Sequence, residues 1–442
     1  MQEKKFKSII TLNPYAQTYF KYENRSLARF YPLKFSKKNF YLSFLRAKDL
    51  IFTTISLSKN IPQEDIYDVL EMRIYEELDL DQAIEYVFDY ELLPSLPHEK
   101  EQKFAVFISE AKIIQESFEE LTKTIPFIDA ILPAPTLFKT LYTHDILDND
   151  EIHFFIYFQK SDAFVALYQN GTLLYTKSLK YSFEYIAERI SEKKGKEVSA
   201  NDVMQRLSKE GLKISDLDEL PYYMEIFNEL FMFINDILIY IKRANEIEHI
   251  DKIFIGSEIG FIKGIEEYSQ TYLAHKAFDL HFDYGIKTQE PFVEELHYLM
   301  ALCGEDILER NIPYVNLTLF KRPPPLSKRP SGRLLLVAGI SALLALAYPL
   351  YNYIYAQKIR FEIAQLKKEY PKIHQKRVEL EKSINTLRAQ IKSIREKIAQ
   401  KSQELKKREQ ILQAIYNKKV TYTMKAATLA ELTQDLVAYK LK

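Results

Sequence analysis

The uncharged run LLLVAGISALLALAYPLYNYIYA, residues Leu334–Ala356, decides the architecture of this chain. About 20 apolar residues in a helix span the hydrocarbon core of a bilayer. Tyrosines gather at the far end of the run, as aromatic side chains do at a membrane–water interface. The alternative is a helix buried in a soluble core, but core helices rarely run this long without a charged residue. We therefore expect one transmembrane helix over 334–356.

The flanks of this run predict its orientation. The near flank, KRPPPLSKRPSGR at 321–333, carries five basic residues and no acidic one, whereas only Lys358 and Arg360 follow closely at the far end. The denser basic flank favours the cytoplasmic side. The start of the chain lacks an apolar run long enough for a secretory signal. We expect residues 1–320 in the cytoplasm and, in a Gram-negative cell, the residues beyond 356 in the periplasm, as in a single-pass inner-membrane protein.

The formal net charge of zero hides a strong asymmetry along the chain. Residues 1–320 carry 35 Lys and Arg against 52 Asp and Glu, which leaves −17, whereas residues 357–419 carry 18 against 7, which leaves +11. An acidic head and a basic stalk imply different partners at the two ends. The single cysteine, Cys303, excludes an internal disulfide, and we expect a small buried side chain there. No His and Cys spacing fits a zinc site, so we predict no metal.

The residues after the membrane run follow an unbroken heptad repeat. Its core positions are Ile363, Leu366, Tyr370, Ile373, Arg377, Leu380, Ile384, Leu387, Ile391, Ile394, Ile398, Lys401, Leu405, Arg408, Leu412 and Ile415. Thirteen of these sixteen positions are apolar, which predicts a coiled coil. The candidate partner-binding residues of this seam are Ile384, Leu387, Ile391, Ile394 and Ile398. Arg377, Lys401 and Arg408 weaken the seam and set its register or partner, and Pro371 is expected to kink its start.

A basic coil is also compatible with nucleic-acid binding. The charges fall largely on outer positions and only Tyr370 adds an aromatic ring, so a solvated outer face is favoured and no nucleic acid is expected. The last stretch, YTMKAATLAELTQDLVAYKLK (Tyr422–Lys442), predicts an amphipathic helix with Leu429, Leu432 and Leu436 on one side. Because one helix cannot bury its own face, it either packs on a partner or belongs to a further domain.

The head alternates between strand-like and helix-like runs, which predicts an α/β domain. Strands are expected within 6–13, 39–44, 49–57, 103–110, 153–159, 162–179 and 249–257. Helices are expected over Gln63–Leu78, Ala111–Thr124, Ser182–Lys194, Ala200–Lys209, Pro221–Ala244 and Phe261–Leu273. A three-strand opening and paired α/β halves predict two related subdomains.

Four stretches of the head carry a resemblance to a known family. They are IPQEDIYDVLEMRIYEELDLDQAIEYVFDYELL (Ile61–Leu93), KTIPFIDAILPAPTLFKTLY (Lys123–Tyr142), ALYQNGTLLYTKSLKYSFEYIAERISEKKGKEVSANDVMQRLSKEGL (Ala166–Leu212) and HIDKIFIGSEIGFIKGIEEYSQTYL (His249–Leu273). In this order they resemble PilM, the actin-like cytoplasmic protein of type IV pilus machines, and GspL of type II secretion. The resemblance covers most of 1–300 and implies an actin-like (RNase H-like) head of two subdomains.

The next stretch, NIPYVNLTLF (Asn311–Phe320), resembles the N-terminal tail of PilN, whose membrane helix, coil and ferredoxin-like domain follow in that order. The chain therefore resembles a PilM–PilN fusion, which is also the layout of GspL. The implied parts are a PilM-like head over 1–310, a PilN-like tail and basic linker over 311–333, a transmembrane helix over 334–356, a periplasmic coil over 357–416, and the start of a ferredoxin-like domain or a terminal helix over 417–442.

The resemblance also implies a docking role for the tail, because the PilN tail binds a groove on PilM. The candidate partner-binding residues are Val315, Asn316, Leu317 and Leu319. Alternation would place the three apolar side chains on one side of an extended segment, with Asn316 available for hydrogen bonds. The alternative is an ordinary final strand of the head. Whether the tail reaches its own groove or that of a neighbouring copy is left open.

An actin-like ATPase needs a glycine-containing loop near its N-terminus, where backbone N–H groups meet phosphate. Here Ser8–Gln17 contains neither Asp nor Gly, and no glycine stands beside Asp162. Gly256 and Gly260 are present, but Ser257 and Glu258 interrupt the expected glycine pair. We therefore predict no catalytic, cofactor-binding or metal-binding residue and no enzyme. Adjacent acids such as Glu294 and Glu295 do not share a helix face and are expected to be solvated.

Two kinds of function remain. The first is a non-catalytic scaffold of a type IV pilus, type II secretion or DNA-uptake machine. It would couple a cytoplasmic assembly ATPase and platform protein to periplasmic alignment proteins, pairing through its coil with a PilO- or GspM-like bitopic protein in a homo- or hetero-oligomer. The alternative is a membrane-tethered actin-like ATP-binding protein or nucleotide switch. A flagellar-motor or cell-division scaffold built from the same parts is a third possibility, and the sequence leaves the machine open.

Overall fold

The structure is a computed structural model that describes residues 6–95, 99–324 and 329–416. It divides into two compact units, Met1–Pro323 and Pro324–Lys442. The first unit holds all the strands among the described residues, and the second holds one long helix. The terminal helix predicted over 417–442 lies outside the described residues.

The first sheet of the head has the strand order β14-β3-β2-β1-β4-β8. Its strands are β1 (Ser8–Asn13), β2 (Thr18–Glu23), β3 (Ser26–Arg29), β4 (Asn39–Leu45), β8 (Ala130–Pro133) and the short β14 (Lys287–Thr288). The first three strands form an antiparallel meander, and β1, β4 and β8 run parallel to one another. All six residues of β1 are buried, as expected for a central strand covered on both faces.

The second sheet repeats this pattern. Its order is β11-β10-β9-β12-β13. Its strands are β9 (Ile152–Phe158), β10 (Ala163–Gln169), β11 (Thr172–Ser178), β12 (Lys252–Ser257) and β13 (Ala277–Asp279). Again a three-stranded antiparallel meander is followed by two strands parallel to its first strand. This duplication confirms the predicted two-subdomain, actin-like arrangement of the head.

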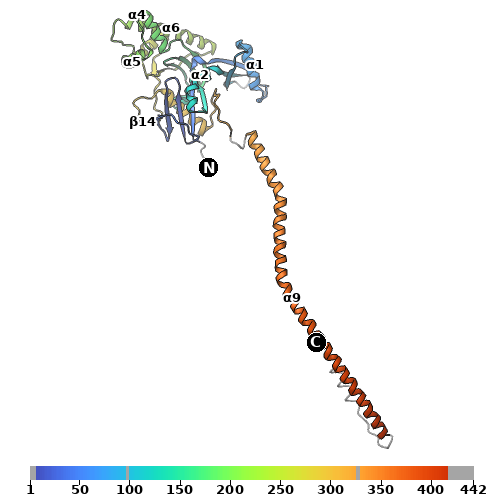
Figure 1. The fold of residues 1–442 in the computed structure, drawn as a ribbon. Coiled ribbons are helices and arrows are strands. Elements are labelled where there is room, and N and C mark those ends of the chain that lie inside the picture. The colour runs from blue at the N-terminus through green and yellow to red at the C-terminus, as the bar shows by residue number, and fades with distance from the viewer. Residues whose placement is uncertain (1–5, 96–98, 325–328, 417–442) are drawn as a thin grey trace. The chain divides into compact units, whose positions relative to one another are not determined.

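A third, smaller sheet is inserted in the chain between β4 and β8. It has the order β5-β7-β6, formed by β5 (Ile51–Ser58), β6 (Tyr86–Leu92) and β7 (Glu101–Glu110), with both outer strands antiparallel to β7. Helix α1 (Ile66–Leu78) packs on this sheet through Ile66, Leu70 and Ile74. Figure 1 shows α1 on one side of the head, away from α4, α5 and α6.

The other helices of the head are α2 (Ala111–Thr124), α3 (Lys139–Thr143), α4 (Phe183–Lys194), α5 (Ala200–Glu210), α6 (Leu220–Ala244), α7 (Ile265–Leu273) and α8 (Glu295–Glu305). Local sequence explains their ends. Helix α5 begins at a capping box in which Ser199 and Asp202 satisfy each other's backbone N–H groups, and α4 ends at Gly195 with a left-handed φ of 62°. Helix α8 packs against β1 and β4, and every residue from Glu295 to Gly304 is buried. Cys303 is buried there, as predicted.

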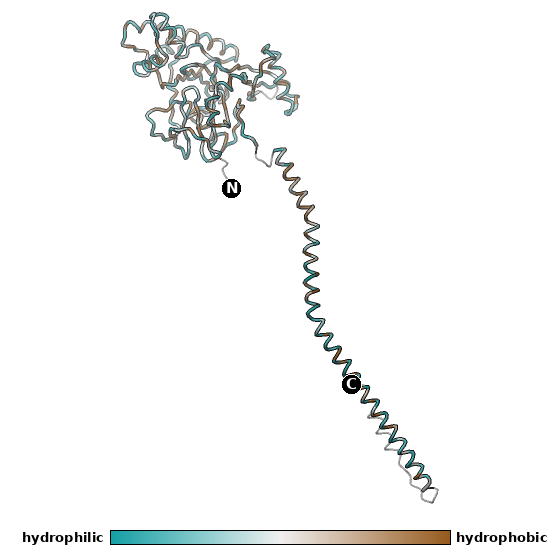
Figure 2. Tube along the Cα trace, in the orientation of Figure 1, coloured by the Kyte–Doolittle hydropathy of each residue, from teal (hydrophilic) through white to brown (hydrophobic). Residues whose placement is uncertain are grey.

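The second unit contains α9 (Pro330–Tyr416), which continues through both Pro349 and Pro371. Pro371 therefore does not end the helix. Among the described residues this is the one helix long and apolar enough to cross a membrane, and its apolar window is not buried. Figure 2 shows the apolar stretch in the first part of α9 and a more hydrophilic helix beyond it.

Candidate functional site

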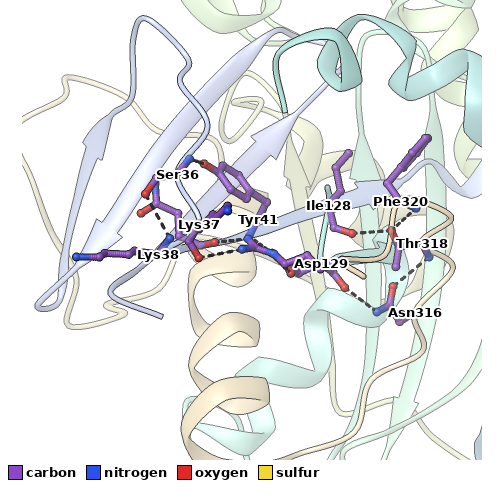
Figure 3. Close-up of polar contacts among 11 residues, drawn as sticks. Ser36, Lys37, Lys38, Tyr41, Ile128, Asp129, Asn316, Thr318 and Phe320 are labelled. Atoms are coloured by element: carbon purple, nitrogen blue, oxygen red, sulfur yellow. Dashed lines mark hydrogen bonds and ion pairs between the residues drawn. The ribbon is translucent and has the colours of Figure 1, made fainter. Parts of the chain in front are cut away.

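The segment that leaves the head, residues 314–322, lies along β8, the edge strand of the first sheet. We call it the docked segment (Figure 3). The Leu317 N–H donates to the Ile131 carbonyl at 2.9 Å, and the Ile128 N–H donates to the Phe320 carbonyl at 3.0 Å. The edge of a sheet offers unpaired N–H and C=O groups to a second extended chain. Here the docked segment of the same chain occupies the edge at β8.

Asn316 is the centre of this contact. Its side-chain Oδ1 accepts from the N–H groups of Ile131, at 3.0 Å, and Thr318, at 3.1 Å. Its Nδ2 donates to the Asp129 carbonyl at 3.0 Å, and its backbone N–H donates to Asp89 Oδ2 at 2.7 Å. One side chain therefore replaces several ladder bonds of a regular strand, which explains why the docked segment follows β8 without being a strand itself.

The burial of the docked segment follows the predicted alternation from Val315 to Leu317 and departs from it at Thr318. Val315 and Leu317 are 3% and 0% exposed, and Leu319 is partly buried against the same core. Thr318 is also buried, and its hydroxyl is satisfied there by donating to the Ile128 carbonyl at 2.7 Å. The structure places these predicted residues on the head of their own chain.

Arg322 fixes the downstream end of the docked segment. Its Nε and Nη2 donate to the two oxygens of Asp129 at 2.6 and 2.8 Å, and Nη1 donates to the Lys37 carbonyl at 2.9 Å. Nη2 also donates to the Asn39 carbonyl, and the guanidinium carbon lies 5.0 Å from the centre of the Phe6 ring. Two hydrogen bonds from one guanidinium to both oxygens of one carboxylate require a particular geometry, so this contact fixes the position of Arg322.

Asp306 fixes the upstream end. It accepts from the Tyr314 hydroxyl at 2.6 Å and from the Thr143 hydroxyl at 2.5 Å. Although its burial opposes ionisation, hydrogen bonds from His144, Thr143 and Tyr314 hold the pKa of Asp306 below its ordinary value. The docked segment is therefore held at both ends by carboxylates of the head.

The predicted seam residues of the coil lie on α9, in the second unit. Ile384, Leu387, Ile391, Ile394 and Ile398 are 46% to 61% exposed. They recur at steps of three and four, so they share one face of the helix. The structure thus gathers the predicted site residues in two separate places, the tail on the head and the stripe on α9.

We call the two subdomains of the head, built on the first and the second sheet, its two lobes. Side chains cross the cleft between them. Asp162, in the β9–β10 turn, accepts from the N–H groups of Ala47 and Lys48 at 2.7 and 3.2 Å, and Arg46 Nη1 donates to Ser161 Oγ at 2.8 Å. Burial raises the pKa of Asp162 to about 7. The cavity left beside these bridges has a volume of about 280 Å³ and is lined by Asn13, Tyr15, Arg46, Lys48, Gln159, Lys160, Ser161, Glu184 and Glu258.

Glu294 and Glu295 are not solvated, contrary to the prediction from sequence. They are 6% and 7% exposed because the chain turns inward where α8 begins. Glu294 accepts from Asn13 Nδ2 at 2.8 Å and from the Tyr157 hydroxyl at 3.2 Å, and so links the two lobes. Burial, and then the nearby Glu258, raise the pKa of Glu294 to about 8.

Sequence reasoning missed the three carboxylates that hold the docked segment, Asp89, Asp129 and Asp306. A signal was present for two of them. Asp89 lies inside an apolar strand and Asp129 directly precedes one, and a carboxylate at such a place needs donors. The sequence does not show that the docked segment supplies donors to both, because Asn316 lies 227 positions after Asp89 and Arg322 lies 193 positions after Asp129.

No family model and no curated protein matches the sequence. Among solved structures, the chain is similar to a PilM–PilN type IV pilus biogenesis complex at 12% identity and a TM-score of 0.48, over 68% of this chain and 92% of that chain. It is similar to the cytoplasmic domain of EpsL, an inner membrane component of the type II secretion system of Vibrio cholerae, at 9% identity and a TM-score of 0.32, over 70% and 96%. A protein of unknown function with an actin-like ATPase fold from Bacteroides thetaiotaomicron is similar at 10% identity and a TM-score of 0.34, over 68% and 96%. The chain is thus similar to a pilus biogenesis complex and to a type II secretion component.

Proposed function

We propose that this chain is a non-catalytic, single-pass scaffold of the bacterial inner membrane, in a machine of the type IV pilus, type II secretion or DNA-uptake kind. The head lies in the cytoplasm, the coil lies in the periplasm, and the protein couples an assembly ATPase and platform protein to periplasmic alignment proteins. The coil pairs with a PilO- or GspM-like bitopic protein.

The observation that carries this proposal is the docked segment. It is bonded to β8 by Asn316 and to Asp129 by Arg322, and α9 begins at Pro330, only eight residues after Arg322. A head joined to a membrane helix by so short a linker can pass force or displacement to a coil beyond it. Val315, Asn316, Leu317 and Leu319 thus act as a docking element supplied by the chain itself.

The charges support different partners at the two ends. A head of −17 attracts a basic surface on an assembly ATPase or its adaptor, with an attraction that salt weakens. The coil of +11, with Arg377, Lys401 and Arg408 at core positions, favours a partner helix that is not a copy of itself.

The second candidate function is a nucleotide switch, favoured by the actin-like arrangement of the two lobes. Against it, direct bridges from Asp162 and Arg46 occupy the cleft where a nucleotide would join the lobes. The loops at Ser8–Gln17 and around Asp162 also lack the glycines that bring backbone N–H groups close to phosphate.

Complementation of a deletion strain separates the two functions. Substitution of the seam, Ile391→Asp with Ile394→Asp, is expected to abolish pilus assembly, secretion or DNA uptake, whereas Lys48→Ala with Lys160→Ala in the cleft is expected to leave it intact. The matched control for the coil is Lys392→Asp, on its outer face. Loss of the process in the cleft variant, with the seam variant active, would favour the nucleotide switch and contradict the scaffold.

A further inference from the structure

The connection between β3 and β4 is a basic surface on an acidic head. From Asn24 to Lys48 the sequence contains seven Lys and Arg and no Asp or Glu, although the head as a whole has a net charge of −17. Within this stretch, residues Phe30–Lys38 form the connection itself, with Lys34, Lys37 and Lys38 all exposed. No ion pair holds these three lysines within the described part of the chain. We call residues 30–38 the basic loop.

The basic loop also exposes an aromatic side chain. Tyr31 is 85% exposed, the highest value for any large hydrophobic residue of the described structure. Covering this exposed ring with another surface would remove apolar area from water, which is favourable. Tyrosines collect at membrane–water interfaces because the ring favours the apolar side and the hydroxyl favours water.

The fold holds the basic loop in one shape. The Ser36 N–H donates to the Tyr41 hydroxyl at 2.7 Å (Figure 3). That hydroxyl donates to the Lys34 carbonyl at 3.2 Å. The Phe35 ring stacks on the Tyr41 ring at 5.7 Å, and the Lys7 N–H donates to the Lys38 carbonyl at 2.7 Å. The lysine side chains thus stand on a backbone that is fixed before any partner binds.

The basic loop adjoins the residue through which the head joins its membrane linker. Arg322 donates to the carbonyls of Lys37 and Asn39, and Leu334 begins the apolar run 12 residues later. Twelve residues span at most about 40 Å when fully extended. The linker adds Lys321, Lys328, Arg329 and Arg333, and it adds no acid.

We infer that the basic loop is a lipid-binding surface, which lies against anionic phosphate headgroups of the bilayer that holds α9. Lys34, Lys37 and Lys38 contact the phosphates, and Tyr31 enters the headgroup layer. Clusters of Lys and Arg near a membrane helix are attracted to anionic lipid over about a Debye length. This contact would fix the orientation of the head on the membrane. The inference rests on the membrane anchoring in the proposed function, but not on the scaffold role.

The chain has no tryptophan, which makes Tyr31→Trp a single fluorescent reporter of this surface. The full-length variant is reconstituted in vesicles of phosphatidylcholine, with or without phosphatidylglycerol. We expect the tryptophan emission to shift to the blue by several nanometres, and to be quenched by lipids with brominated acyl chains, only when phosphatidylglycerol is present. High salt should reverse both changes.

Charge reversal in the same background tests the lysines. Lys34→Glu, Lys37→Glu and Lys38→Glu together should abolish the shift, while Lys196→Glu, Lys209→Glu and Lys276→Glu, a matched change at exposed positions of the second lobe, should preserve it. Circular dichroism confirms that both variants are folded. Emission that is the same in both lipid mixtures, or equal loss of the shift in the two triple variants, would overturn the inference. A shift caused by duplex DNA but not by anionic vesicles would assign the surface to nucleic acid instead.

Discussion

Arg322 fixes the end of the docked segment from which the linker continues. Replacing it by alanine leaves the Asp129 carboxylate, which is 9% exposed, without its charged partner. Loss of one partner of a largely buried pair costs several times more than loss of a surface pair. The Ile128 amide donates to the Phe320 carbonyl of the docked segment. We therefore expect Arg322→Ala to speed hydrogen exchange at this amide by at least about tenfold, which corresponds to a loss of about 1.4 kcal/mol of local stability.

The control for Arg322→Ala is the amide of Phe164 in the second sheet, whose exchange should not change. Arg322→Lys should restore little protection, because an ammonium group cannot form the paired bonds of the guanidinium. Unchanged exchange at Ile128 in the alanine variant would mean that Arg322 does not hold the segment.

Glu294 links stability to pH. Its pKa of about 8 in the folded head lies above its ordinary value near 4.5, so the folded state binds a proton that the unfolded state has released. Asp162, whose pKa is raised to about 7, also keeps a proton in the folded state that the unfolded state has released, up to about pH 7. His297, whose pKa burial lowers to about 3, changes stability only below the ordinary histidine pKa near 6.5.

The free energy of unfolding of residues 1–323 is therefore expected to fall as the pH rises from 6.5 to 8, with a slope of up to about 1.4 kcal/mol per pH unit for each proton. Glu294→Gln should flatten the slope, whereas Glu184→Gln, at the rim of the cleft, should not. Urea denaturation at several pH values measures it. A slope that is unchanged in Glu294→Gln would contradict the assignment.

At the scale of elements, α9 exposes the apolar stripe from Ile384 to Ile398 in a single copy. A helix with thirteen apolar core positions of sixteen is expected to associate, and the basic core residues disfavour a pair of identical chains. We expect residues 357–416 to form a more stable complex with a PilO- or GspM-like coil than with themselves. Analytical ultracentrifugation of the segment, alone and mixed with that coil, measures this.

Arg377→Ile with Lys401→Leu should strengthen self-association of the coil segment, because both substitutions remove charge from the core. The control is Lys382→Ala with Lys392→Ala, at outer positions. If the natural segment stays monomeric both alone and with the partner coil, the stripe is not an interface.

The sequence predicts some elements well and others poorly, for physical reasons. Helix α2 was expected over the residues where it occurs, because its buried Ile114, Phe118 and Leu121 repeat at helical spacing. Helix α8 was missed, since nearly every one of its residues is buried and no polar face marks the period. The docked segment was expected from resemblance, but its anchors at Asp129 and Asp306 depend on contacts between residues far apart in the sequence.

At the scale of the whole molecule, the head is an actin-like fold whose lobes are joined by their own side chains. We expect residues 1–323 to give no binding heat with Mg-ATP in calorimetry, because Asp162 and Arg46 bridge the cleft and no glycine precedes Gly171. Opening the bridge with Asp162→Ala is not expected to create binding, since the phosphate-contacting loops would still be missing. Micromolar binding by the natural head would contradict this and support the nucleotide switch.

The central claim is that the docked segment, rather than the head's core, joins the head to its membrane stalk. Asn316→Ala with Leu317→Ala in the full-length protein removes the hydrogen-bonding hub and one buried side chain. Trypsin should then cleave after Lys321 much faster, because the segment leaves β8, while circular dichroism shows a folded head. Asn228→Ala with Leu217→Ala, the same substitutions at less buried positions, should behave like the natural protein. If the Asn316 and Leu317 variant instead unfolds the whole head, the segment is core structure and the claim is wrong.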